Sequence, residues 1–248
     1  MQTKTLLIDG DILIYKIATS NEVDTHWGDG LWTLHCDENA CKAEVDAQIE
    51  DLGSQLAADN YVVALTDKHN FRKDVLPTYK SNRAGKRKPM VLNSLRKYIM
   101  EKHNGVIWKN LEADDVLGIM ATEPSDDQRI IVSIDKDLKQ IPAFISVDGH
   151  VVEETPKRLA DYWFMLQTLT GDAVDGYAGL PTVGIKTAEK LINKYTNVPI
   201  LDLWKVVVEL YKSKGFTEQE ALQQSRVARI LRHGEYNKDT GAVKLWMQ

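Results

Sequence analysis

The sequence predicts an α/β fold built on a mostly parallel sheet, followed by a helical C-terminal region. Within the first 150 or so of its 248 residues, short apolar runs typical of strands alternate with helical patterns. Acidic residues directly follow three of these runs, and the carboxyl edge of a parallel sheet is where ligand sites form. From Thr155 onward the apolar spacing becomes helical.

The elements follow from this patterning. Thr155 and Pro156 are typical of a helix start, and the segment Thr217–Glu220 is a capping box that begins another helix, which Gly234 would close. The first two strands are separated by a helical stripe of Cys41, Val45, Ile49, Leu52 and Leu56. The buried stripe of the helix after Pro156 would be Leu159, Tyr162, Trp163, Leu166 and Leu169. The expected strands are Thr5–Ile8, Tyr61–Thr66, Val106–Trp108, Arg129–Ile134 and Phe144–Val147.

No internal repeat, low-complexity tract or long linker interrupts the chain. We therefore expect residues 1–154 and 155–248 to pack as one unit. Residues 68–102, called the basic segment below, form a long excursion from the sheet edge, because Pro77, Gly85 and Pro89 lie amid charge before a helical pattern resumes.

Composition narrows the class of protein. A hydrophobic content of 43% is ample for a buried core, and no stretch is apolar enough to span a membrane. No signal-peptide cleavage site follows the N-terminus. Cys36 and Cys41 lie in a segment that reads as helix, where they would not face each other, and the six histidines show no metal-ligand spacing. These features predict ordinary thiols and a cytoplasmic protein.

The charge distribution favours a nucleic-acid partner although the net charge is −5. The basic segment holds eleven Lys and Arg residues and only two acids, Asp74 and Glu101. Such a local excess is the electrostatic footprint of a phosphate backbone. The alternative is a solvated helix face, which would normally interleave both signs.

Runs of carboxylates recur at separated places along the chain. Like charges repel, so a protein gathers them mainly where cations neutralise them, and oxygen-only donors suit Mg²⁺ or Mn²⁺. Two such ions about 3.5–4 Å apart support hydrolysis of a phosphodiester. Taken alone, the LEADD run is equally explained as acids at a helix start. The candidate metal ligands are Asp9, Asp67, Glu112, Asp114, Asp115, Asp135, Asp137, Asp172 and Asp175.

A glycine-bounded hairpin, Gly179 to Gly184, precedes a helix that runs from Ile185 towards Tyr195. Glycines let a backbone approach a phosphate, and a helix start offers N–H donors, to which Lys186 and Thr187 add a charge and a hydroxyl. Backbone carbonyls of the hairpin could also coordinate K⁺. The alternative is a simple turn between two helices.

As an ordered set, these motifs resemble the flap endonuclease and 5′→3′ exonuclease superfamily. The matching stretches are LLIDGD, TDKHNFR with LPTYKSNR, LEADD, SIDKD and GDAVDGYAGLPTVGIKTAEKL, over roughly residues 5–195. The opening DGDILIYKIATSNEVDTHW and the closing ARILRHGEYNKDTGAVKLW are similar to 5′→3′ exonucleases of short-tailed bacteriophages. The resemblance implies a PIN-like core, an arch-like basic segment and a helix–three-turn–helix over residues 171–195.

The resemblance also implies roles for individual residues. Asp9, Asp67, Glu112 and Asp114 match carboxylates around a first metal ion, whereas Asp135, Asp137, Asp172 and Asp175 match those near a second. Asp115 matches an extra acid of the phage members. Lys80 and Arg83 match catalytic residues that steady the scissile phosphate, Tyr79 one that stacks on a terminal base, and Arg72 belongs with them to the DNA-binding set. Asp11 stands where the wider family has another polar residue, so no role carries over to it.

The activity implied is metal-dependent 5′→3′ hydrolysis of duplex DNA at nicks, gaps, blunt ends or flaps, with RNA–DNA hybrids as a second substrate, in the bacterial host cytoplasm. Two other readings stay open. A phosphatase with a DxD nucleophile would use Asp9 and Asp11, with Thr66 and the Asp114–Asp115 pair, but has no use for the basic segment. A non-catalytic DNA-binding module would leave the acids unexplained.

Overall fold

The computed structural model describes residues 2–147 and 149–247 of the chain. Within that part, a six-stranded sheet has the order β5-β4-β1-β6-β7-β8. All its neighbouring strands are parallel except β8, which pairs antiparallel with β7. The strands are β1 (Lys4–Asp9), β4 (Asn60–Ala64), β5 (Gly105–Val106), β6 (Gln128–Val132), β7 (Phe144–Ser146) and β8 (Val152–Glu154). The predicted α/β class is confirmed, whereas the antiparallel β8 was not predicted.

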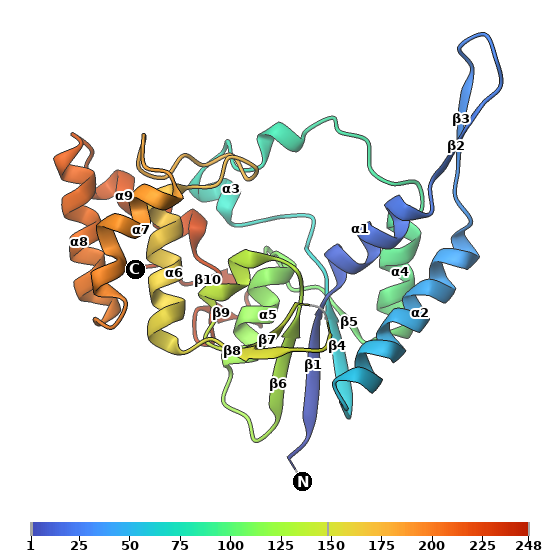
Figure 1. Cartoon of the computed structure of the whole chain (residues 1–248), viewed down its shortest axis with the longest axis horizontal. Helices are drawn as coiled ribbons and strands as arrows, with labels where there is room; N and C mark the ends of the chain where they lie inside the picture. The colour runs from blue at the N-terminus through green and yellow to red at the C-terminus, as the bar shows by residue number, and fades with distance from the viewer. Residues whose placement is uncertain (1, 148, 248) are drawn as a thin grey trace.

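Helices cover both faces of the sheet (Figure 1). Side chains alternate along each strand, so Leu6 and Ile8 of β1 pack on one face and Leu7 on the other. The first face is covered by α1 (Gly10–Ser20), α2 (Glu38–Gln55) and α4 (Leu92–Lys102). The second is covered by α5 (Ala113–Thr122). Because both faces are buried there, residues 6–8, 62–64 and 130–132 of the central strands are continuously apolar.

The junction of β1 and α1 fixes the position of Asp9. The Asp9 side chain caps α1 by accepting a hydrogen bond from the backbone N of Ile12 at 3.1 Å. Gly10 allows α1 to lie directly against β4, because a Cβ at Gly10 would lie 2.6 Å from Cγ1 of Val63. The sequence DG at the end of β1 therefore anchors a carboxylate at the carboxyl edge of the sheet.

The helical region comprises α6 (Lys157–Thr170), α7 (Ile185–Ile192), α8 (Ile200–Ser213) and α9 (Glu218–Ala228) around a core of their own. The predicted stripe of α6 was partly wrong: Leu159 is exposed and Phe164 and Met165 are buried, because α7, α8 and α9 pack against a broad face of α6. The capping box at Thr217 is confirmed. Gly234 does not close α9, since that helix ends at Ala228.

Residues 229–245 leave the helical region and return to the sheet. Ile230 and Leu231 are buried with α5, and a short hairpin, β9 (Tyr236–Asn237) with β10 (Ala242–Val243), packs near Trp108. Gly118 of α5 permits this contact, because a Cβ there would lie 2.4 Å from the carbonyl oxygen of Leu231. The end of the described chain thus completes the core of its first half.

The basic segment leaves the sheet after β4, runs past the helical region at α3 and crosses above the sheet to α4, which returns it to β5 (Figure 1). It contains the short helix α3 (Arg72–Val75) and a 3₁₀ turn at Ser81–Arg83. Its position between β4 and β5 agrees with the excursion expected from the sequence.

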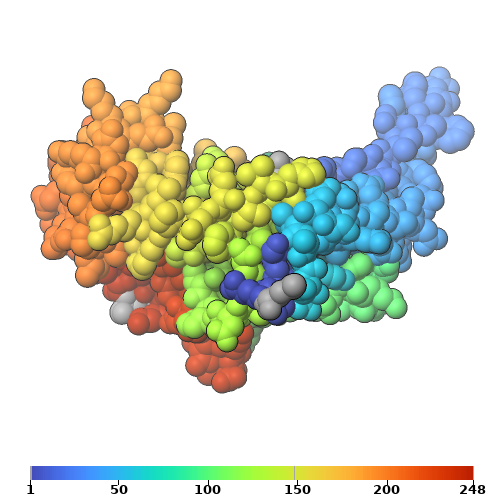
Figure 2. All heavy atoms as spheres, turned by 60° about the horizontal axis from the view of Figure 1, so that its bottom comes forward, coloured from blue at the N-terminus to red at the C-terminus, as the bar shows by residue number. Residues whose placement is uncertain are grey.

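A second excursion was not predicted. Between α1 and α2 the chain forms an antiparallel hairpin, β2 (Val23–His26) with β3 (Trp32–His35), which stands clear of the body at the end opposite the helical region (Figures 1 and 2). The expected placement of the two cysteines in one helix was also wrong, although both are free thiols as expected. Cys36 precedes α2 rather than lying within it, and the Sγ atoms of Cys36 and Cys41 are 3.5 Å apart.

None of the helices in residues 2–147 and 149–247 combines the length and apolar content needed to cross a membrane.

Candidate active site

The acids after β1 and β6 meet because the two strands are parallel neighbours. Ser133 joins them: its Oγ donates to Oδ2 of Asp9 at 2.8 Å and accepts from the backbone N of Asp135 at 3.1 Å. The Asp135 carboxylate in turn accepts from the backbone N of Asp137 at 2.8 Å, which starts a 3₁₀ turn. The carboxyl ends of two adjacent strands therefore position three of the predicted metal ligands, Asp9, Asp135 and Asp137.

Asp114 approaches this pair from the first turn of α5. Burial, followed by the charges of Asp9 and Asp135, raises the pKa of Asp114 well above its ordinary value. Burial also raises the pKa of Asp9 to about 6, and the charge of Asp135 adds to the shift. A bound cation would relieve the mutual repulsion that raises these pKa values.

A second group lies beside the first. Burial raises the pKa of Asp137 to about 6, with further contributions from the charges of Asp135 and Asp172. Gln167 of α6 orients Asp137 by donating from Nε2 to its Oδ2 at 2.7 Å. Asp137 and Asp172 also line an open cavity of about 380 Å³ that extends to Ile185 at the start of α7.

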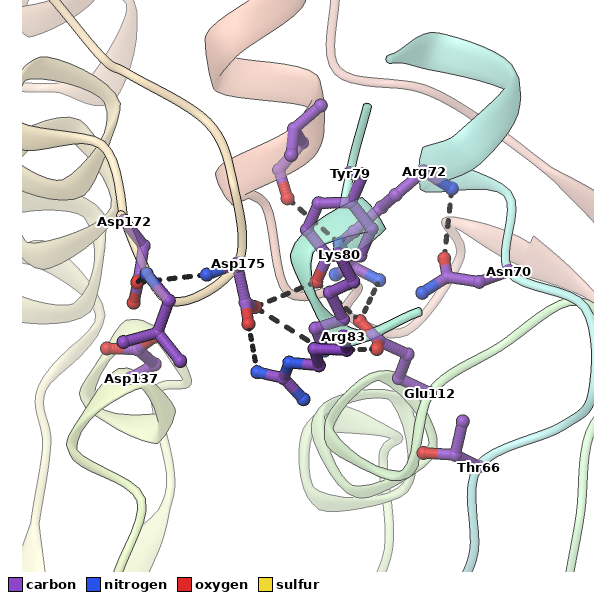
Figure 3. A network of polar contacts seen from close by, with 12 residues as sticks. Thr66, Asn70, Arg72, Tyr79, Lys80, Arg83, Glu112, Asp137, Asp172 and Asp175 are labelled. Carbon is purple, nitrogen blue, oxygen red and sulfur yellow. Dashed lines mark hydrogen bonds and ion pairs between the residues drawn. The ribbon is translucent and has the colours of Figure 1, made fainter. Parts of the chain in front are cut away.

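The GDAVD run forms a compact turn that presents Asp172 and Asp175 (Figure 3). Oδ1 of Asp172 accepts from the backbone N of Val174 at 2.7 Å and from that of Asp175 at 3.2 Å. The turn closes with paired backbone hydrogen bonds between Asp172 and Tyr177. This local geometry explains why the two acids are three residues apart.

Lys80 and Arg83, the predicted catalytic residues of the basic segment, contact carboxylates of this edge directly (Figure 3). The Nζ atom of Lys80 is paired with Glu112 and lies 3.4 Å from Oδ2 of Asp175, and Arg83 is paired with Asp175. Lys80 has a left-handed backbone (φ 54°), uncommon for a side chain, and its backbone N donates to the carbonyl oxygen of Asp175 at 2.7 Å. The basic segment is thus seated on the acidic edge.

Positive charge around Glu112 outweighs its burial. Burial alone would raise the pKa of Glu112, but Arg72 and Lys80 lower it to about 2. Glu112 is therefore ionised throughout the physiological range. By contrast, burial raises the pKa of Asp9 and of Asp137 to about 6, which is close to the physiological range.

The metal assignment of Asp115 was wrong. Asp115 is fully buried, and Arg72 grips both its oxygens at 2.7 and 2.8 Å. The same carboxylate accepts from the backbone N of Glu112 at 3.2 Å and from that of Leu231 at 3.1 Å. The alternative reading of LEADD, acids that start a helix, therefore holds for Asp115.

The DNA-binding assignment of Arg72 was wrong for the same reason. Only 3% of Arg72 is exposed, and its guanidinium also donates to the carbonyl oxygens of Val227 and Arg229. Arg72 instead joins the basic segment, α5 and the returning segment 229–245. Tyr79 is likewise buried, and its hydroxyl donates to Glu112 and Asp175 at 2.8 and 2.9 Å, which leaves no ring face for a DNA base.

Two further predicted residues have local roles. Asp67 holds a loop, since Oδ1 accepts from the backbone N of Lys68 at 2.7 Å and Oδ2 from that of Asn110 at 2.9 Å. Gly179 is buried with φ of 63°, and its N–H donates to Gln224 at 2.8 Å, so it shapes the turn rather than facing a phosphate. The metal role expected of Asp67 and the DNA-binding role expected of Gly179 stay predictions.

The other predicted residues of the hairpin are accessible. Gly184 is the N-cap of α7, and a Cβ there would meet nothing within 4 Å. Lys186 and Thr187, in the first turn of α7, are exposed. This helix start offers the open backbone and the positive charge that were expected of a phosphate contact.

The donor set fits hard divalent cations, because it consists of carboxylates whose mutual repulsion a cation would relieve. Among residues 2–147 and 149–247, however, no three Asp, Glu, His or Cys side chains form a ready-made metal cluster. Lys80 and Arg83 neutralise Glu112 and Asp175. Among the other acids, the charge of Asp135 raises the pKa of both Asp114 and Asp137, so Asp135 couples the two groups electrostatically.

Residues that position the acids were missed from the sequence. Ser133 lies two residues before Asp135 in VSID and could have been noticed there. Gln167 lies thirty residues from Asp137, and no local pattern marks it.

The raised pKa of Asp9 makes a prediction about stability. The folded protein holds a proton on Asp9 that the unfolded chain releases, so this contribution is complete below about pH 4 and is lost as the pH rises through about 6. Asp9→Asn cannot ionise and retains a capping oxygen. In chelator at about pH 7 it should therefore be more stable than the wild type by on the order of 2 kcal/mol, with no gain at about pH 4. Urea denaturation at both pH values measures this, and equal pH profiles of the two proteins would contradict it.

Fold and site together define a nuclease-like α/β protein with an acidic sheet edge. The family model for the 5′-3′ exonuclease N-terminal resolvase-like domain matches residues 4–155. The chain is 30% identical to the exodeoxyribonuclease of Enterobacteria phage T3 and 29% identical to the exonuclease of Escherichia phage T7; each match covers 97% of this chain and 92% of the relative. The chain belongs to the 5′-3′ exonuclease family, which confirms the resemblance seen in its motifs.

Solved structures agree on the fold. The bacteriophage T5 flap endonuclease, in a pseudo-enzyme–product complex with DNA and metal ions, is similar with a TM-score of 0.66 and 17% identity, over 91% of this chain and 88% of that one. The T5 5′-exonuclease with zinc ions gives a TM-score of 0.67 at 17% identity, over 92% and 89% of the two chains. The expected flap-endonuclease-like core is therefore confirmed.

Proposed function

We propose that this protein is a divalent-metal-dependent 5′→3′ exodeoxyribonuclease. The observation that carries the proposal is the seating of Lys80 and Arg83 on the carboxylates of an acidic sheet edge. A site that places carboxylates next to basic side chains able to bind a phosphate suits phosphodiester hydrolysis. Membership of the 5′-3′ exonuclease family supports the same reaction.

Two Mg²⁺ or Mn²⁺ ions fit the donor set. Asp9, Glu112 and Asp114 would hold one, with Asp67 as the further ligand expected from the sequence, and the other would be held by Asp135, Asp137, Asp172 and Asp175. When bound, such ions activate a water and stabilise the leaving oxygen of an in-line displacement. Ser133 and Gln167 fix the orientations of Asp9 and Asp137, respectively, by the hydrogen bonds described above.

Lys80 and Arg83 would hold the scissile phosphate. Their partners in the structure are the carboxylate oxygens of Glu112 and Asp175, and phosphate oxygens offer the same negative charge to the same donors. Lys80 lies between Glu112 and Asp175, so a small movement of its side chain would replace a carboxylate partner with a phosphate oxygen.

The turns between α6 and α7 would grip the DNA backbone as a helix–three-turn–helix over residues 171–195. Gly184, Lys186 and Thr187 present open backbone, charge and hydroxyl at the start of α7. The cavity beside Asp137 and Asp172 reaches Ile185, so one strand could contact both sites. Carbonyl groups of the 179–184 turn would bind K⁺ in support of this grip.

The substrates would be duplex DNA with a 5′ end at a nick, gap, blunt terminus or flap, and RNA–DNA hybrids. The T5 neighbour has been seen with DNA, which supports a DNA substrate here. If the chain is phage-encoded, it would act in the cytoplasm of the bacterial host. The boundary between core and helical region would lie near residue 154.

The two alternatives have less support. Asp11, the second acid of a DxD phosphatase, is held by Arg96 and the backbone of Thr66. A purely DNA-binding module gives no reason for carboxylates that raise one another's pKa at a sheet edge.

Product analysis tests the proposal. We expect mononucleotides from recessed or blunt 5′ ends of end-labelled duplexes in Mg²⁺, a single short oligonucleotide from a 5′ flap, and no product in chelator. Cleavage that proceeds equally in chelator would contradict the metal dependence. Trapping of a phosphoryl group on Asp9 would favour the phosphatase, and DNA binding without any product would favour the binding module.

A further inference from the structure

Thr66, just beyond the end of β4, is held through all of its polar groups. Its backbone N donates to Oδ2 of Asp11 at 2.9 Å, and its carbonyl oxygen accepts from Arg96. Its hydroxyl accepts from the backbone N of Ala113 at 3.0 Å. Oδ1 of Asp11 closes the network by pairing with Arg96 at 2.5 Å. We call Asp11, Arg96 and Thr66 the clamp.

The clamp joins three elements that serve the proposed site. Asp11 lies two residues after Asp9 in α1, and Arg96 lies in α4, which anchors the C-terminal end of the basic segment. Ala113 lies between Glu112 and Asp114. The clamp therefore ties the basic segment to the backbone from which acids of the first metal group project.

We propose that Asp11 and Arg96 are positioning residues that set the spacing of Asp9, Glu112 and Asp114 through Thr66, and that neither contacts the metal or the DNA. The inference rests on the proposed function, since it assigns a role toward the cations of that site. Residues that orient metal ligands typically contribute about 10- to 100-fold to metal affinity or activity.

The geometry argues against a direct ligand role for Asp11. One of its oxygens is taken by the guanidinium of Arg96 and the other by the backbone N of Thr66. The planar guanidinium bonds Asp11 and Thr66 at once, which the single ammonium group of lysine reproduces poorly. Both side chains are only about a quarter to a third exposed, so the network is partly shielded from water.

Asp11→Asn, Arg96→Gln, Arg96→Lys and the Asp11→Asn/Arg96→Gln double variant test the proposal in the full chain. Mn²⁺ binding without DNA is followed by the spin-resonance signal of the free ion, and the Mg²⁺ midpoint of cleavage is measured separately. We expect Asp11→Asn and Arg96→Gln each to weaken Mn²⁺ binding about tenfold or more. The double variant should lose no more than the worse single variant, because both act in one network. Arg96→Lys should be intermediate.

Lys97→Ala is the matched control. Lys97 is the next residue of α4 and forms an exposed pair with Glu101 at 3.6 Å, so its loss should leave Mn²⁺ binding unchanged. DNA affinity in chelator should not fall in Asp11→Asn, and it should fall no further in Arg96→Gln than in Lys97→Ala, because each of those two variants removes one positive charge of the basic segment.

Three outcomes would overturn the clamp. Variants with a lower melting temperature but wild-type Mn²⁺ affinity would show a structural role only. Loss of Mn²⁺ binding in Asp11→Asn but not in Arg96→Gln would make Asp11 a direct ligand. Weaker DNA binding in Arg96→Gln than in Lys97→Ala would make Arg96 a DNA contact. A wild-type chain that binds Mn²⁺ yet cleaves nothing would reject the proposed nuclease while leaving the Mn²⁺ test intact.

Discussion

Asp135→Asn/Asp137→Asn is expected to reduce turnover of nicked duplex DNA by a factor of at least about 10³. Asp135 is the carboxylate that connects the two acidic groups, and Asp137 is oriented towards the second by Gln167. Removing both charges should eliminate the second cation and weaken the first. DNA affinity in chelator should be unchanged or higher, since two negative charges have left the binding face.

Asp126→Asn/Asp127→Asn provides the control for this variant. These acids precede the amino end of β6, whereas Asp135 and Asp137 follow its carboxyl end, so the change in net charge is identical and only its position differs. Single-turnover cleavage separates chemistry from binding. Undiminished turnover of the Asp135→Asn/Asp137→Asn variant would remove the basis for the metal assignment.

Arg72→Met is expected to lower the free energy of unfolding by about 3–5 kcal/mol. Arg72 neutralises Asp115, which has no exposure to water, and it satisfies the carbonyl oxygens of Val227 and Arg229. Without Arg72, the buried carboxylate of Asp115 loses its counter-charge and keeps two backbone N–H donors, while the two carbonyls lose the guanidinium donor. Methionine fills similar volume, so the loss of donors dominates over the loss of packing.

Chemical denaturation followed by tryptophan fluorescence measures this effect. Adding Asp115→Leu to Arg72→Met should recover part of the stability, because the unpaired charge is then absent. Arg87→Ala, which removes an exposed arginine paired with Glu22, should change stability little. If Arg72→Met were no more costly than Arg87→Ala, the Arg72–Asp115 network could not hold the two halves of the chain together.

The sheet could be predicted because its signals are local. Each parallel strand is a short apolar run, and Asp9 and Asp135 directly follow such runs, so their meeting at one edge follows from strand pairing alone. The turn at Asp172 and Asp175 is equally local.

The interaction partners of individual acidic and basic residues were harder to predict from the sequence. Asp115 and Asp114 are adjacent in sequence and face opposite environments, one Arg72 and the other Asp9. Arg72 reaches Val227 and Arg229, more than 150 residues away, and no local pattern encodes such a partner. The hairpin at β2 and β3 escaped notice because its side chains, such as Trp27 and Trp32, are exposed and follow no core-facing alternation.

The return of residues 229–245 to the sheet has a consequence for biosynthesis. Ile230 and Leu231 cover α5, and Leu231 also caps the carboxylate of Asp115. While a nascent polypeptide is still being translated, α5 and the acids at its start lack this cover, although all the strands of the sheet have already emerged. The cover of α5 and of the Asp115 carboxylate can therefore be completed only after Leu231 has left the ribosome.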